Sequence, residues 1–215
     1  MNIVVLISGS GSNLQAIIDQ IHQGRIPGRI VSVISNRPGV KGLERAQQHG
    51  ISTQVIDHTQ YDNRETFDLA MMAHIDACQP DLIVLAGFMR VLTTTFVDHY
   101  QGRLLNIHPS LLPKYKGLNT HARAIEAGDS EHGCSVHFVS SELDSGAIIA
   151  QAAVPIEAND TADSLSKKVQ TQEHRLYPAC VGLFCHGLLK WTPEGVLYKD
   201  APLATTGVPF SELSD

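Results

Sequence analysis

The chain has 215 residues, of which 43% are hydrophobic and 18% charged, and its formal net charge at pH 7 is −6. This length suits one domain with a small appendage, and such a chain buries roughly 70% of its unfolded surface. The acidic balance without a basic block argues against a nucleic-acid partner, and no apolar run approaches the ~20 residues of a membrane span. Four cysteines without a Cys-x-x-Cys pair are typical of reduced thiols in a cytoplasmic protein.

Short β-branched runs alternate with amphipathic stretches through the first two thirds of the chain. Strands are predicted at residues 3–7, 30–34, 54–56, 81–85, 104–107 and 135–139, and helices at residues 12–23, 41–49 and 64–78. This alternation, with strands that are almost continuously apolar, predicts an α/β fold. We expect a doubly wound, mostly parallel central sheet with helices on both faces.

The second half of the chain changes character. Residues 147–155 are predicted to form a strand that meets the sheet differently, and Asp160-Thr161 can cap a long helix that runs towards Gly187. Pro178 should kink or divide this helix. Residues 191–215 contain three prolines and little periodicity, which predicts a peripheral hairpin and a loose end in the same domain as residues 1–190.

A glycine-rich loop, Ser8-Gly9-Ser10-Gly11-Ser12-Asn13, follows the first strand and leads into a helix. Glycines allow a tight turn, and the N–H groups at the helix start attract an anion. The loop lacks the third glycine of the dinucleotide fingerprint and the Gly-Lys-Ser/Thr ending of the Walker A motif. A single phosphate is therefore the expected ligand, and a tight turn without any ligand is the alternative.

Two further strand ends carry unusual chemistry. In a parallel sheet, ligands bind beyond the carboxyl ends of the strands. The segment Gly87-Phe88-Met89-Arg90-Val91-Leu92, after the strand at 81–85, offers backbone polar groups, apolar contacts and one cation. It suits a flat, partly apolar ligand that carries acidic groups, whereas the alternative is a loop that covers the core and leaves its arginine in solvent.

The most informative feature is a set of three polar side chains, Asn106, His108 and Asp144. Asn106 and His108 are two residues apart, so in an extended segment they face the same way. Pro109 pushes His108 out of the helical region, and Asp144-Ser145-Gly146 forms a tight turn that can present a carboxylate. An amide donor, an imidazole and a carboxylate in these settings indicate one acyl-transfer site.

Two other kinds of site are disfavoured by the same sequence. Ser110 lies beside His108 without the Gly-x-Ser-x-Gly elbow of serine hydrolases. Among the eleven histidines, His132 and His137 have no further ligand at a convincing metal spacing, and we expect no metal. His121, His132, His137 and His174 are therefore interpreted as surface or packed imidazoles.

The motifs together resemble the folate-dependent formyltransferases. The resemblance covers about residues 2–190. It rests on the Gly11-Ser12-Asn13 loop, Leu85-Ala86-Gly87-Phe88-Met89-Arg90, Asn106-Ile107-His108-Pro109-Ser110-Leu111-Leu112-Pro113-x-Tyr115-x-Gly117, Ser141-x-Leu143-Asp144-x-Gly146 and Gln170-Thr171-Gln172-Glu173-His174. The last of these is similar to the members that formylate glycinamide ribonucleotide in purine synthesis. Asn119, where relatives often carry histidine, is a small departure in a loop.

The resemblance implies a Rossmann-like formyltransferase fold, with residues 1–190 as the catalytic domain. It implies that the formyl group of 10-formyltetrahydrofolate, a co-substrate, passes to the amine of glycinamide ribonucleotide without a metal. Asn106, His108 and Asp144 would be catalytic. The implied ribonucleotide-binding residues are Gly11, Ser12, Asn13, Gln170, Thr171, Gln172 and Glu173. The implied folate-binding residues are Arg64, Met89, Arg90, Val91, Leu92, Asn106, Ser140, Ser141, Glu142, Leu143 and Asp144.

Three rival functions are weaker. Methionyl-tRNA formyltransferase should carry a further C-terminal nucleic-acid-binding domain and more positive charge, and formyltetrahydrofolate deformylase an extra N-terminal domain. Because this chain begins at its first strand and ends soon after the long helix, both are disfavoured. A non-catalytic nucleotide-binding module would leave Asn106, His108 and Asp144 without a role. Both a monomer and a homodimer are compatible with the sequence.

Overall fold

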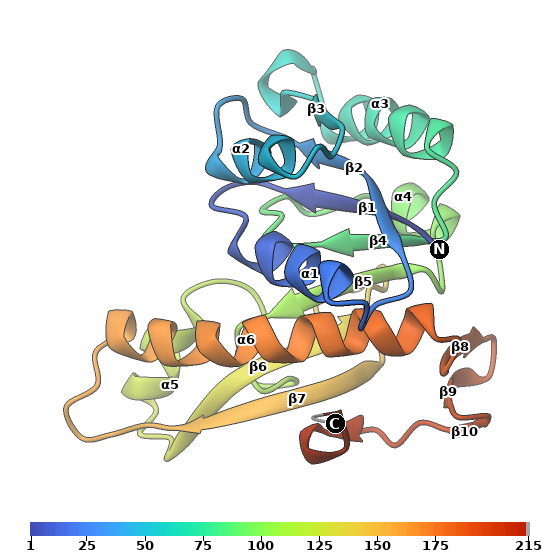
Figure 1. Ribbon diagram of the computed structural model, residues 1–215. Coiled ribbons are helices and arrows are strands. Elements are labelled where there is room, and N and C mark those ends of the chain that lie inside the picture. The colour runs from blue at the N-terminus through green and yellow to red at the C-terminus, as the bar shows by residue number, and fades with distance from the viewer. Residues whose placement is uncertain (214–215) are drawn as a thin grey trace. The chain divides into compact units, whose positions relative to one another are not determined.

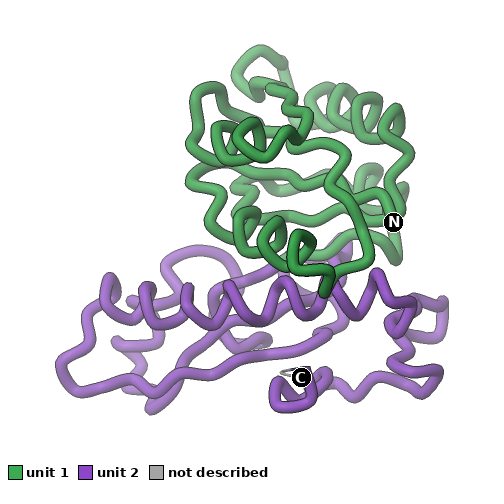
Figure 2. The backbone as a smooth tube through the Cα atoms, in the orientation of Figure 1, with its two compact units in different colours: residues 1–106 green, residues 107–215 purple. Residues whose placement is uncertain are grey.

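The computed structural model describes residues 1–213, and the chain divides into two compact units, residues 1–106 and 107–215 (Figures 1 and 2). Over the described residues, no helix combines the length and the apolar character that crossing a bilayer would require. The elements of unit 1 are β1 (Asn2–Ile7), α1 (Ser12–His22), β2 (Arg29–Ser35), α2 (Lys41–Gln48), β3 (Thr53–Val55), η1 (His58–Gln60), α3 (Arg64–Ala77), β4 (Leu82–Leu85), α4 (Thr94–His99) and the start of β5 (Leu104–His108).

The strands of unit 1 are all parallel and lie in the order β5-β4-β1-β2-β3. The chain therefore moves outward from β1 to β3 and then returns past β1 to β4 and β5. Because such crossovers are right-handed, helices before and after this reversal cover opposite faces. In Figure 1, α1 packs beside α2, and α3 and α4 pack together on the other face. The predicted doubly wound arrangement is confirmed.

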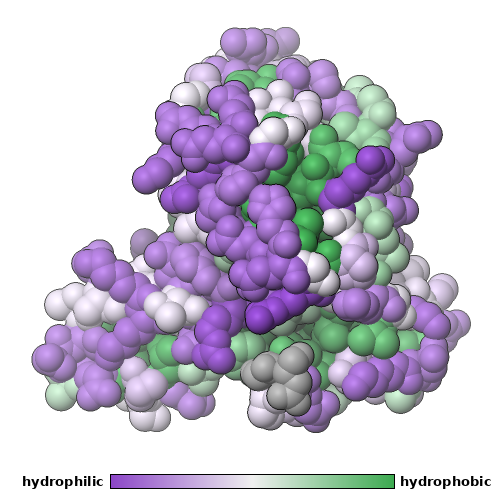
Figure 3. All heavy atoms as spheres, in the orientation of Figure 1, coloured by the Kyte–Doolittle hydropathy of each residue, from purple (hydrophilic) through white to green (hydrophobic). Residues whose placement is uncertain are grey.

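The central strands β1 and β4 are apolar because both of their faces are covered. Ile3–Ile7 of β1 are fully buried, and Leu82–Leu85 of β4 are almost so. Helix α1 contributes Leu14, Ile17 and Ile18 to the same core, and each buried Leu or Ile side chain stabilises the fold by about 1.5–3 kcal/mol. Figure 3 shows that the outer surface in this view is mostly hydrophilic, with small hydrophobic patches.

Unit 2 combines an antiparallel strand pair with one long helix. Strands β6 and β7 pair antiparallel, and α6 packs on both of them. The strand predicted at 147–155 is present as β7 and runs opposite to β6, the strand that precedes it. The elements of unit 2 after β5 are α5 (Thr120–Glu126), β6 (Glu131–Phe138), β7 (Ile148–Pro155), α6 (Ala162–Cys185), β8 (Leu189–Thr192), β9 (Gly195–Tyr198), β10 (Ala201–Pro202), β11 (Val208–Pro209) and η2 (Phe210–Leu213).

Helix α6 begins with the predicted capping residue. Thr161 and Ser164 form a reciprocal capping box. Beside them, hydrogen bonds from Lys168, the Glu157 backbone and Ser164 lower the pKa of Asp160 to about 2. The prediction that Pro178 could divide the helix is wrong, because α6 runs through it to Cys185. Buried side chains on both sides of Pro178 hold the helix together through tertiary packing.

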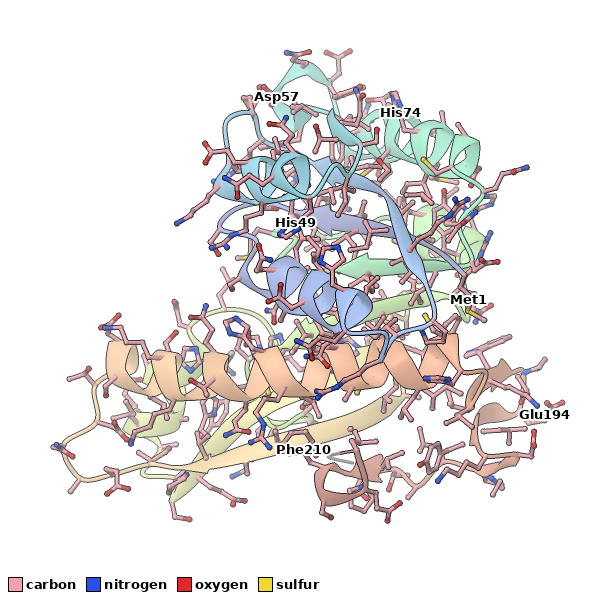
Figure 4. All side chains as sticks on the ribbon, in the orientation of Figure 1. Met1, His49, Asp57, His74, Glu194 and Phe210 are labelled. Carbon is pink, nitrogen blue, oxygen red and sulfur yellow. The ribbon has the colours of Figure 1, made fainter. Side chains whose placement is uncertain are left out.

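The C-terminal segment is more ordered than the sequence indicates. Strands β8, β9 and β10 form a small antiparallel sheet, which confirms the peripheral hairpin. The predicted loose end is wrong, since β11 pairs in parallel with β7 and Val208 is buried. Phe210, labelled in Figure 4, follows β11, and the Arg175 guanidinium of α6 lies 5.1 Å from its ring centroid. That residues 191–215 belong to one domain with residues 1–190 stays a prediction.

Candidate active site

The carboxyl ends of three strands of unit 1 align at one edge of the sheet. Leu6 of β1 is paired with Leu85 of β4, and Leu85 with Asn106 of β5. The loops after β1 and β4 are also tied together, because the Met89 N–H donates to Ser8 Oγ at 2.8 Å. Ser8 Oγ in turn donates to Asn36 Oδ1 at 2.6 Å. The predicted convergence of these strand ends is confirmed.

The glycine-rich loop is held closely against α2. Gly11 caps α1 with a φ of 69°, and a Cβ there would lie 2.5 Å from the Gly42 Cα. The Gly42 N–H donates to Gly9 O at 3.0 Å, and Arg45 Nε donates to Ser10 O at 2.9 Å. Only glycine allows this conformation and this close approach together. The first N–H groups of a helix cannot bond within it, so the loop suits an anion, and phosphate binding by Gly11, Ser12 and Asn13 stays a prediction.

The loop after β4 presents apolar side chains and a cation. Met89 is 62% exposed and Val91 54%. Arg90 Nε is buried and has no hydrogen-bond partner within the described residues. Arg64 is exposed at the start of α3, whose N-cap is Asn63. These features suit a ligand with apolar rings and acidic groups, and folate binding by Arg64 and Met89–Leu92 stays a prediction.

The structure brings together His108 and Asp144, which are far apart in the sequence. His108 ends β5, and its Nδ1 lies 3.4 Å from Asp144 Oδ2. The Gly117 N–H donates to the same carboxylate oxygen at 3.0 Å. Both side chains are only 8% exposed, so solvent screens the electrostatic interaction between them only weakly. Asn106 lies two residues before His108 on the extended strand β5, so the two side chains leave the same face.

The backbone fixes which nitrogen of His108 is available for chemistry. His108 Nε2 lies 2.9 Å from the carbonyl oxygen of Tyr115. A carbonyl only accepts hydrogen bonds, so Nε2 carries a proton and donates. Nδ1 is then the nitrogen that faces Asp144 and can gain or release a proton.

A second imidazole lies on the other side of the same carboxylate. His137 Nε2 is 3.8 Å from Asp144 Oδ1, and His137 Nδ1 donates to Phe138 O at 2.9 Å. Burial lowers the pKa of His137, while the bond to Phe138 and the charge of Asp144 oppose this shift. The interpretation of His137 as a packed imidazole is confirmed, but its position beside Asp144 was not predicted. The sequence carries one signal for this position, namely that successive side chains of a strand alternate between its two faces and that His137 lies on the strand predicted at 135–139.

The turn at Ser141–Gly146, which we call the acidic turn, has a constrained backbone. Asp144 has a φ of 48°, and Ser140 Oγ and Ser145 Oγ donate to the carbonyls of Glu142 and Leu143. A Cβ on Gly146 would lie 1.7 Å from Phe138 O. Glycine is therefore required for the turn to approach β6. Leu143 is 52% exposed, and folate binding by Ser140–Asp144 stays a prediction.

A buried hydrogen-bond network supports the chain just after His108. Ser135 Oγ donates to Ser110 O at 2.6 Å and accepts from the Leu112 N–H at 3.0 Å. Gln151 Nε2 donates to Ser135 Oγ at 2.8 Å and to Leu112 O at 2.9 Å. The hydroxyl of Ser135 thus connects β6 and β7 to the loop that follows β5.

We expect Ser135→Ala to lower the free energy of unfolding by about 2–3 kcal/mol, because it leaves the Leu112 N–H buried without its acceptor. Urea denaturation measures this change. Ser130→Ala is the control, since Ser130 is exposed and should change stability by less than about 0.5 kcal/mol. Equal stability of the two variants would contradict the proposed network.

Two more histidines of unit 2 pack against each other. The rings of His121 and His132 lie 5.1 Å apart in a T-shaped arrangement. Burial, followed by the charge of His121, lowers the pKa of His132 to about 4, and burial also lowers the pKa of His121. His132 Nε2 is buried without a hydrogen-bond partner in the described part of the chain. The pair is therefore neutral at pH 7.

The protonation of His132 should make stability depend on pH. A histidine in the unfolded chain binds a proton below about pH 6.5, whereas the folded state resists this down to about pH 4. The free energy of unfolding should therefore fall by about 2 kcal/mol from this residue between pH 7.5 and pH 5. His132→Asn, which cannot titrate, should flatten this dependence in urea denaturation, and the exposed control His186→Asn should not. The same slope in both variants would contradict the assignment.

Residues 170–173 lie on α6, so the helix points their side chains in different directions. Side chains that are three apart on a helix share a face, so Gln170 and Glu173 point the same way. Thr171 Oγ1 instead donates to Lys167 O at 3.1 Å within the helix, and Gln172 points elsewhere. A role for all four in binding one ribonucleotide stays a prediction, and the helix geometry favours Gln170 and Glu173 as the pair that acts together.

The fold and the paired His108 and Asp144 are those that the sequence predicts for a group-transfer enzyme of the acyl-transfer kind. Comparison with known proteins gives its family. The formyl transferase family model matches residues 1–181. Phosphoribosylglycinamide formyltransferase of Escherichia coli is 56% identical over 190 residues, which are 88% of this chain and 90% of that protein.

Two other matches extend this likeness. The structure of phosphoribosylglycinamide formyltransferase from Coxiella burnetii, in complex with CHES, has a TM-score of 0.93 at 49% identity and covers 97% of this chain and 98% of that chain. The trifunctional purine biosynthetic protein adenosine-3 of Homo sapiens is 45% identical over 193 residues, or 90% of this chain, but the match spans only 19% of that longer protein. This chain belongs to the formyl transferase family. The expected α/β formyltransferase fold and enzyme class are confirmed.

Proposed function

We propose that this chain transfers the formyl group of 10-formyltetrahydrofolate to the amine of glycinamide ribonucleotide, as a step of purine synthesis. The observation that carries the proposal is the buried pair of His108 and Asp144, 3.4 Å apart, in a member of the formyl transferase family. The names of the Escherichia coli and Coxiella burnetii relatives support this choice of substrate. The four cysteines of the chain, none of them in a Cys-x-x-Cys motif, suit a cytoplasmic location.

The ribonucleotide is proposed to bind through its phosphate at the start of α1, where Gly11, Ser12 and Asn13 lie. Gln170 and Glu173, on one face of α6, are proposed to bind the rest of this substrate. The exposed Met89 and Val91, and separately the exposed Leu143, suit the apolar rings of the folate. Arg64 and Arg90 suit its acidic tail.

The chemistry follows from the three catalytic side chains. As the substrate amine attacks the formyl carbon, Asn106 donates a hydrogen bond to the formyl oxygen, which becomes negatively charged. His108, protonated on both nitrogens, donates its Nδ1 proton towards the same oxygen, while Nε2 stays bonded to Tyr115 O. Asp144 stabilises the imidazolium and relays a proton from the attacking amine to the leaving nitrogen, directly or through water. The proton that the amine loses is thus the proton that the leaving nitrogen gains, and the enzyme is unchanged.

The test is to mix purified protein with glycinamide ribonucleotide and 10-formyltetrahydrofolate and to follow both products. We expect formylated ribonucleotide and tetrahydrofolate in equal amounts. Tetrahydrofolate with free formate instead would identify a deformylase, and the absence of both products would overturn the proposal.

The phosphate site has its own prediction. Asn13→Ala should raise the KM for glycinamide ribonucleotide by about tenfold and leave kcat nearly unchanged, because it removes binding that the ground state and transition state share. Steady-state kinetics with each substrate varied in turn measures this. A change confined to the KM for the folate would contradict the assignment.

A further inference from the structure

The side chain of Tyr115 has no role in the chemistry above, yet its backbone touches the catalytic histidine. Its carbonyl oxygen accepts the hydrogen bond from His108 Nε2 at 2.9 Å. Tyr115 has a φ of 55°, a region that bulky side chains rarely occupy. Such a conformation persists only where surrounding contacts hold it.

Those contacts come from three different elements around the side chain. The Tyr115 hydroxyl donates to Asp129 Oδ2 at 2.7 Å, in the turn between α5 and β6. The guanidinium of Arg123, on α5, lies 5.2 Å from the ring centroid. The ring of His132, on β6, meets the tyrosine ring edge-on at 6.0 Å. The bond to Asp129 raises the pKa of the tyrosine hydroxyl and lowers the pKa of the carboxyl.

We propose that Tyr115 is a positioning residue, whose side-chain anchors aim its carbonyl at His108 and fix the tautomer of the neutral imidazole, so that Nδ1 is the nitrogen that takes up the proton used in formyl transfer. The neutral imidazole has two tautomers, and only the one protonated on Nε2 can donate to a carbonyl. The other would turn an unprotonated Nε2 towards Tyr115 O, so that two acceptors face each other, and would leave Nδ1 already protonated and unable to take up a proton. The chain of contacts thus runs from Asp129 through Tyr115 to His108 and on to Asp144.

This inference rests on the proposed function for its effect on rate, but the tautomer itself can be measured without substrate. The ¹⁵N chemical shifts of His108 in the intact protein, at a pH where its ring is neutral, distinguish a protonated from an unprotonated ring nitrogen. In the wild type we expect a proton on Nε2 and none on Nδ1. In Tyr115→Phe, which loses the bond to Asp129, we expect a mixture of both tautomers. Tyr115→Gly loses every side-chain anchor but still tolerates a positive φ, and in this variant we expect a larger share of the tautomer protonated on Nδ1.

The same variants should affect turnover and spare binding. Tyr115→Phe should lower kcat by about five- to tenfold, the effect of one lost positioning hydrogen bond, and leave the KM of both substrates within twofold. Lys114→Met is the matched control. Lys114 Nζ binds the same oxygen, Asp129 Oδ2, at 3.0 Å from the neighbouring position, but its side chain is 60% exposed. This variant should keep the wild-type tautomer and kcat.

Four results would overturn the proposal. The first is a neutral wild-type His108 that carries its proton on Nδ1. The second is a Tyr115→Phe variant with the wild-type tautomer and kcat, and the third is a Tyr115→Phe variant with a lower kcat but the wild-type tautomer. The fourth is a loss of kcat in Lys114→Met equal to that in Tyr115→Phe. A wild-type protein with the expected tautomer that fails to formylate glycinamide ribonucleotide would instead refute the proposed function and leave the positioning intact.

Discussion

His108→Ala should lower the turnover of formyl transfer by about 10²–10⁴-fold, the range typical of a lost general acid or base. The variant removes the imidazole whose Nδ1 lies 3.4 Å from Asp144 Oδ2 and whose Nε2 donates to Tyr115 O. It should still fold, because the cost is one hydrogen bond and a small cavity. Initial rates with both substrates saturating measure kcat, and circular dichroism checks the fold.

The matched control for this prediction is His186→Ala, which removes an exposed histidine just after α6. It should retain wild-type turnover. A His108→Ala variant with turnover near that of the wild type would show that the chemistry lies elsewhere.

Gly146→Ala should damage both stability and activity. The added Cβ would lie 1.7 Å from Phe138 O, a backbone atom of β6 that cannot move without breaking the strand. We expect a loss of about 3 kcal/mol or more in the free energy of unfolding, above the usual range for overpacking. Any folded protein should also turn over slowly, because the overlap displaces Asp144, two residues away.

Gly9→Ala provides the comparison for stability. A Cβ on Gly9 would meet no atom within 4 Å, so its free energy of unfolding should stay within about 0.5 kcal/mol of the wild type. Urea denaturation of both variants makes the test. If Gly146→Ala were as stable as Gly9→Ala, the close approach of the acidic turn to β6 would be wrong.

The sequence predicted the parts of the fold that repeat a clear pattern. The apolar strands β1 and β4 and the amphipathic α1 bury side chains on defined faces, so their residue spacing carries the information. Helices α4 and α5 were missed because six and seven residues hold too few turns to show a periodicity. Strand β11 was missed because two residues have no pattern, and its pairing with β7 is a tertiary contact.

The candidate site was predictable where side chains carry the chemistry. Asn106, His108 and Asp144 stand in distinctive motifs, and the structure places the imidazole and the carboxylate 3.4 Å apart. Tyr115 was not assigned a role because it acts through a carbonyl that every residue has. His137 was not distinguished from the other histidines, since its distance to Asp144 depends on how the acidic turn folds back on β6.

The most direct test of the proposed chemistry is a single-turnover reaction with Asp144→Asn, excess enzyme and 10-formyltetrahydrofolate labelled with ¹³C in the formyl group. The asparagine keeps the shape of the side chain and removes its charge. The wild type should move the label to the ribonucleotide amine within one turnover, whereas the variant should bind both substrates and transfer the label at least about 10²-fold more slowly. Transfer at the wild-type rate by Asp144→Asn would contradict the account.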